Sequence, residues 1–183
     1  MSVFFLGIPF VILIHELGHY GATRAYGYSA HLSYASVHFT MPRDEHEGVP
    51  GMIITVAGPL VNFLFAIVGA IGLWVFGRKE SFTKLQTLVV WGCSVLLAGG
   101  GRGVMKVFSP SGSDEAKVAV RLGFPEIIGP LVMSLPALFF AYVLFRFHWR
   151  NDTMLSLIVG LVAGGAGMLT WLTLLGPVVL PRP

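Results

Sequence analysis

The sequence has few charged residues: aspartate, glutamate, lysine and arginine together make up 11% of its 183 positions. Soluble domains carry about 25%, and 55% of this chain is hydrophobic, which argues against an ordinary soluble globule. A disordered chain is excluded because disorder requires low hydrophobicity and high charge. The composition therefore predicts a membrane protein.

Cysteine and clustered basic residues are also scarce. Cys93 is the single cysteine, which excludes an internal disulfide. The 12 basic and 9 acidic residues give a net charge of +3 and are scattered, so we expect no nucleic-acid binding. The first twenty residues lack the basic region and cleavage site of a signal peptide, and we expect them to be retained.

Five long apolar stretches are present instead. A bilayer core of about 30 Å needs roughly 20 helical residues, and lipid leaves no water to satisfy a non-helical backbone. We therefore predict an all-α polytopic membrane protein of about five transmembrane helices, forming a single domain over residues 1–183. The predicted spans are Ser2–Ala22, Val49–Gly77, Leu85–Gly101, Ile127–Phe145 and Thr153–Pro181.

Two connecting segments have local patterns of their own. After the first span, HLSYASVHF alternates polar with aromatic or aliphatic residues, which predicts a short strand or hairpin at the membrane surface. After the third, Ser113 is placed to cap a short helix through Leu122, with Asp114 and Glu115 in its first turn.

The motif HELGH, from His15 to His19, lies within the first span. Residues four apart share a helix face, so the two imidazoles can bind one Zn²⁺, and Glu16 can reach a water on that ion. The alternative is that these side chains only pair with polar groups inside a helical bundle. Ionisable groups inside a span are costly and usually functional, which favours a metal site.

A catalytic zinc usually takes a third protein ligand. If loops alternate sides of the membrane, Asp114, just after the third span, lies on the same face as the end of the first span. That topology favours Asp114 as the third ligand. The acids and histidines of the loop after the first span, and Glu115, are the less favoured alternatives. The full set of candidates is Asp44, Glu45, Glu47, Asp114, Glu115, Glu126, His31, His38 and His46.

The second span contains AGPLVN, residues 57–62. Gly58 and Pro59 weaken the helix, which predicts a kink or a helix start at this point. Asn62 needs a polar partner at this depth. It either faces a substrate peptide or a developing oxyanion, or it makes an interhelical hydrogen bond.

Together, HELGHYGATRAYG, the polar-aromatic strand, AGPLVNFLFAI and SPSGSDEAKVA resemble the site-2 protease family of intramembrane zinc metalloproteases. The resemblance covers about residues 10–122. It implies a catalytic core over about 1–122 with accessory spans over about 123–183. The third motif departs from the family pattern, because Ser113 precedes Asp114 and Glu115 stands where glycine is usual.

The resemblance implies roles for individual residues. His15, His19 and Asp114 would bind zinc, Glu16 would act as general base, and Asn62 would hold or polarise the substrate backbone. The HLSYASVHF strand would pair with an unwound substrate, the transmembrane segment of a membrane-tethered protein. Seven basic residues on the motif-bearing face against five on the other favour an active site near the cytoplasmic face. The alternative function is a non-catalytic metal-binding membrane scaffold, and the sequence leaves the oligomeric state open.

Overall fold

The computed structural model describes residues 2–76, 92, 104, 106–147, 162–164 and 166–181. Most of this part is helical. Three helices are long and apolar enough to cross a membrane: Phe5–Ala25, Val49–Gly72 and Val162–Val179. The predicted class, a helical membrane protein, is confirmed in this coarser form. Most of the predicted third span, Leu85–Gly101, lies outside the described residues, so the count of five spans stays a prediction.

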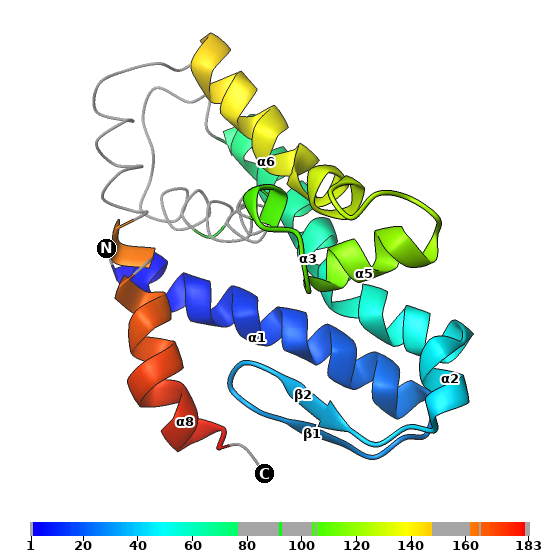
Figure 1. The fold of residues 1–183 in the computed structure, drawn as a ribbon. Helices are drawn as coiled ribbons and strands as arrows, with labels where there is room; N and C mark the ends of the chain where they lie inside the picture. Colours follow the sequence, from blue (N-terminus) through cyan, green and yellow to red (C-terminus); the bar gives the residue numbers. More distant parts are fainter. Residues whose placement is uncertain are drawn as a thin grey trace.

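The N-terminal helix α1, Ser2–Ala25, lies between the two-stranded sheet and a second long helix (Figure 1). α1 is followed by Gly27, which has a positive φ of 82° and whose N–H donates to the carbonyl of Arg24. Glycine adopts this left-handed conformation without steric cost, and it commonly stops a helix. α1 packs along α3, Val49–Phe76, and also contacts the sheet.

A two-stranded antiparallel sheet follows α1, made of β1, Ala30–Leu32, and β2, Val37–Phe39. His31 pairs with His38 across the strands. The turn is closed by the N–H of Ser33, which donates to the carbonyl of Ser36 at 2.8 Å. The predicted hairpin is thus present. The short helix α2, Arg43–Glu47, leads from it into α3.

α3 runs through Pro59 without interruption. Of the kink or helix start predicted at Gly58–Pro59, the helix start is wrong, because α3 begins ten residues before Pro59, at Val49. The tertiary packing of this 28-residue, largely apolar helix outweighs the hydrogen bond that proline removes.

Two further helices pack on α3. The predicted short helix is α5, Asp114–Arg121, and its N-cap is Ser113, whose Oγ accepts from the N–H of Ala116 at 3.2 Å. α6, Ile128–Phe147, follows after a short turn and packs against both α5 and α3.

The C-terminal helix passes through a π-helical turn, η1, Trp171–Leu175, and ends in α8, Gly176–Val179. Its end reaches the hairpin turn, where Trp171 Nε1 donates to the carbonyl of Tyr34 at 2.8 Å. The N–H of Tyr34 donates to the carbonyl of Leu180. The last described helix therefore closes against the hairpin beside α1 (Figure 1).

Candidate metal centre

Two imidazoles project from one face of α1. His15 and His19 are four residues apart, and their Nε2 atoms lie 3.1 Å from each other. Their rings meet edge to face, with centroids 4.8 Å apart and planes at 83°. Both side chains are buried. The helical repeat thus brings two metal-binding nitrogens to one point, as the motif predicts.

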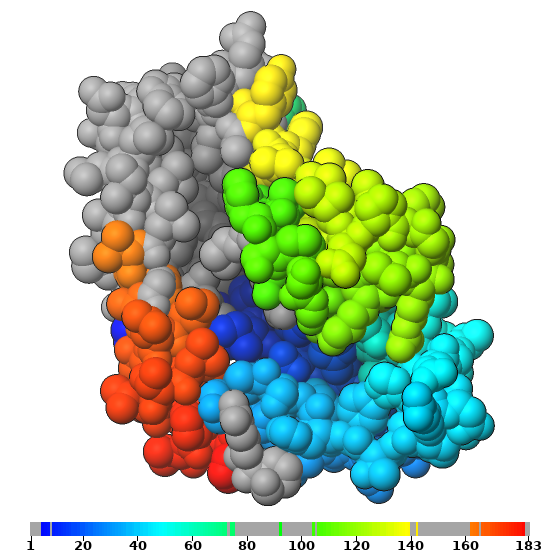
Figure 2. Space-filling model, viewed as in Figure 1, coloured from blue at the N-terminus to red at the C-terminus, as the bar shows by residue number. Residues whose placement is uncertain are grey.

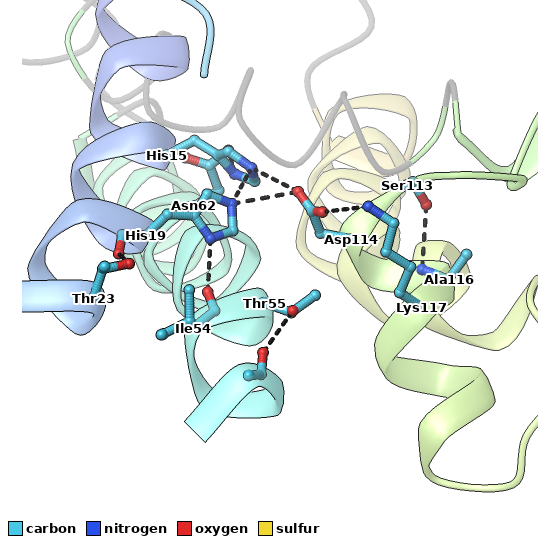
Figure 3. Close-up of polar contacts among 11 residues, drawn as sticks. His15, His19, Thr23, Ile54, Thr55, Asn62, Ser113, Asp114, Ala116 and Lys117 are labelled. Atoms are coloured by element: carbon cyan, nitrogen blue, oxygen red, sulfur yellow. Dashed lines mark hydrogen bonds and ion pairs between the residues drawn. The ribbon is translucent and has the colours of Figure 1, made fainter. Parts of the chain in front are cut away.

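Asp114, the first residue of α5, reaches the same point from the other side (Figure 3). Its Oδ2 lies 3.5 Å from His15 Nε2 and 3.3 Å from His19 Nε2. Almost a hundred residues separate Asp114 from the motif in sequence. The fold therefore gathers the three predicted ligands into one cluster.

The spacing of these three atoms suits a metal ion. For a tetrahedral ion with bonds of about 2.1 Å, neighbouring ligand atoms are about 3.4 Å apart. The separations here are 3.1, 3.3 and 3.5 Å. Among the described residues, His15, His19 and Asp114 form a group that could hold such an ion.

The second ring nitrogen of His19, Nδ1, has a hydrogen-bond partner on α3. His19 Nδ1 donates to the backbone carbonyl of Ile54 on α3 at 2.7 Å. A carbonyl can only accept, so Nδ1 carries a proton, and in the neutral ring the lone pair then lies on Nε2, the nitrogen that faces Asp114. Such contacts orient histidine ligands in metal sites.

His15 has a comparable partner in Asn62. The amide nitrogen of Asn62 lies 3.2 Å from His15 Nδ1, and both side chains are buried. An amide presents a donor or an acceptor depending on how it is turned. With its oxygen toward Nδ1, Asn62 would accept from the ring and leave His15 Nε2 for the ion. The polar partner that Asn62 needs at this depth is therefore a histidine of the cluster.

Glycines allow α1 and α3 to approach closely at this level. A side chain at Gly18 would clash with the backbone carbonyl of Ala57, at 2.7 Å from the added carbon. One at Gly58 would overlap the ring of His19. The small residues of HELGH and AGPLVN thus face each other, and they leave the space in which the imidazole lies.

The start of α5 holds Asp114 in place. Ser113 caps the helix, and Lys117, one turn on, has its Nζ 3.3 Å from Asp114 Oδ1. Burial tends to raise the pKa of the Asp114 carboxyl, but hydrogen bonds from His15 and His19 and the charge of Lys117 lower it well below its usual range. Asp114 is therefore ionised, as a metal ligand must be.

Glu16 follows His15 on α1 and is buried. It is not one of the three clustered residues, and its role as a base stays a prediction. The remaining third-ligand candidates lie elsewhere: Asp44, Glu45, His46 and Glu47 around α2, His31 and His38 in the hairpin, Glu115 in α5, and Glu126 before α6.

Sequence reasoning missed the carbonyl of Ile54, the contact between Gly58 and His19, and the ion pair of Lys117 with Asp114. A backbone carbonyl carries no residue-type signal, so the first could not be found. The other two had a signal, since Gly58 lies in the motif and Lys117 stands one helical turn after Asp114.

Comparisons with known proteins add no assignment, since no family model, curated protein or solved structure significantly matches this chain.

Proposed function

We propose that this protein is an intramembrane zinc metalloprotease of the site-2 protease kind, which hydrolyses a peptide bond in or near the transmembrane segment of a membrane-tethered protein. The observation that carries the proposal is the convergence of two histidine nitrogens and one aspartate oxygen at separations of 3.1 to 3.5 Å. The helix α1 carries HELGH, and α3 supplies the partners of both imidazoles. Both helices are apolar enough to span a bilayer.

Zinc is the metal that this donor set favours. Two imidazoles and one carboxylate are typical of catalytic zinc sites, which leave a further position open. When bound, zinc supplies Lewis acidity that activates water for attack on a peptide carbonyl. The carbonyl of Ile54 accepts from Nδ1 of His19, which suits a metal on Nε2, and the Asn62 amide would do the same for His15 with its oxygen turned toward Nδ1.

Glu16 is the proposed general base. It follows His15 directly on α1 and is buried. A carboxylate there takes a proton from the attacking water and later delivers it to the leaving nitrogen of the peptide. The residues named as ligands are then free of any role in proton transfer.

Substrate access is supported by the shape of one face of the molecule. Figure 2 shows α1 at the floor of a recess between the β1–β2 hairpin and the green segment that contains α5. A hairpin at the rim offers backbone groups to which an extended peptide can pair. In this proposal Asn62, which already contacts His15, holds the substrate backbone or His15 itself.

The proposed substrate is a membrane protein helix, and the bilayer is the surrounding solvent. The basic residues of the motif-bearing segments favour an active site near the cytoplasmic face. The protein would therefore be a multi-pass membrane enzyme that cuts tethered regulators from the cytoplasmic side.

The test is cleavage of a membrane-embedded test helix by the purified full chain in lipid vesicles loaded with zinc. We expect cleavage by the native chain and a loss of about 10²–10⁴-fold in rate for Glu16→Gln, with one zinc retained in both. Glu47→Gln, which removes an exposed carboxylate paired with Arg43, is the matched control and should cleave normally. Zinc bound at unit stoichiometry without any cleavage would instead favour the non-catalytic scaffold.

A further inference from the structure

The two carboxylate oxygens of Asp114 face different partners. Oδ2 lies 3.5 and 3.3 Å from the Nε2 atoms of His15 and His19, whereas Oδ1 lies 3.3 Å from Nζ of Lys117. The Asp114 side chain is 25% exposed and that of Lys117 is 55% exposed. The carboxylate therefore bridges the buried imidazoles and an ammonium group on the outer side (Figure 3).

The backbone leaves Asp114 little freedom to change this arrangement. Ser113 caps the first turn of α5 through the N–H of Ala116, and the close approach of Gly129 to the Glu115 carbonyl seats α5 against α6. With the backbone fixed, the orientation of the carboxylate depends on what its two oxygens contact. Lys117 is the partner of the oxygen that points away from the histidines.

We propose that Lys117 is a positioning residue that makes Asp114 bind the metal through one oxygen only. This rests on the metal centre proposed above. By contacting Oδ1, the ammonium group favours the orientation in which only Oδ2 faces the ion. Two imidazoles and a single oxygen then make three protein contacts, the number that leaves a position for a reactant in catalytic zinc sites.

The role is geometric rather than stabilising. Exposed ion pairs one turn apart on a helix contribute little to folding stability, so the loss of Lys117 should leave the fold intact. Groups that hydrogen-bond to a metal ligand, however, orient that ligand and change the properties of the bound metal. Coordination is therefore the property to measure.

Cobalt(II) is a suitable probe because it occupies nitrogen and oxygen sites and its visible spectrum reports coordination number. The purified full chain is loaded with Co²⁺ in its native form and as Lys117→Met, Lys117→Arg and Lys106→Met. Four-coordinate Co²⁺ absorbs strongly in the visible range, and higher coordination weakens the bands. We expect strong bands in the native chain, a loss of intensity in Lys117→Met, and recovery in Lys117→Arg, which restores a donor to Oδ1.

Lys106→Met is the control for removal of a lysine before α5, and its spectrum should equal that of the native chain. An unchanged spectrum in Lys117→Met, with strong bands in the native chain, would overturn the positioning role and leave the metal centre standing. A native chain that binds no Co²⁺ would overturn the metal centre itself, and the positioning role with it.

Discussion

The imidazole of His19 lies directly against the α-carbon of Gly58, with no space for a side chain between them. This contact joins HELGH on α1 to AGPLVN on α3. Glycine is required at position 58 of AGPLVN because the imidazole of His19, from HELGH, occupies the space that a side chain would need. The helices approach closely because the ring, and not a side chain of α3, fills the gap.

Gly58→Ala should therefore displace His19 and reduce metal binding. The added methyl group has no room unless the ring moves, and movement also breaks the 2.7 Å bond from His19 Nδ1 to the carbonyl of Ile54. We expect zinc affinity to fall by roughly 10–100-fold, as for loss of groups that orient a ligand. Zinc titration of the purified protein measures this.

Gly21→Ala is the matched control, because nothing lies within 4 Å of a side-chain carbon added there. It is in the same helix as His19 and should keep native zinc affinity, with helix stability raised by up to about 1 kcal/mol. Equal zinc affinity for both variants would refute the steric role of Gly58.

Asp114→Ala should lower zinc occupancy more than any change to the acids of α2. It removes the oxygen that lies within 3.5 Å of both imidazoles, and we expect a loss beyond the roughly 100-fold that supporting groups can cause. Metal analysis after dialysis against a weak chelator measures occupancy. Glu45→Ala and Glu47→Ala should retain zinc, and the reverse pattern would move the third ligand into α2.

Asn62→Ala separates the two roles open to this residue. If Asn62 chiefly orients His15, through the 3.2 Å contact to Nδ1, zinc affinity should fall by roughly 10–100-fold. We expect this result. Native zinc affinity combined with slower cleavage would instead assign Asn62 to the substrate. Zinc titration and cleavage rates on the same preparation distinguish the two.

Trp171→Phe should loosen the hairpin turn. It removes the hydrogen bond from Trp171 Nε1 to the carbonyl of Tyr34, which contributes about 1 kcal/mol net. The amide of Tyr34, which donates to Leu180, should then exchange its hydrogen faster. Amide exchange followed by mass spectrometry measures this, and the helix amides around His15 serve as the internal reference. Unchanged exchange at Tyr34 would show that the C-terminal helix does not hold the turn.

Much of this architecture could be anticipated because it depends on local signals. The long apolar stretches predict helices, the alternation in HLSYASVHF predicts the hairpin, and Ser113 predicts the start of α5. Of the kink or helix start expected at Gly58–Pro59, the start is excluded because α3 runs through Pro59, where packing of the whole helix outweighs the local effect of proline. Packing energy depends on the neighbouring helices, so the sequence of one segment does not predict it.

The spacing of His15 and His19 settled, before any fold was known, that two imidazoles share one face, since helical geometry is the same everywhere. Which acid would meet them and which backbone carbonyl would orient His19 depended on how separate helices cross. Those crossings are set by many weak contacts between residues far apart in the chain, and these contacts exist only in the folded structure.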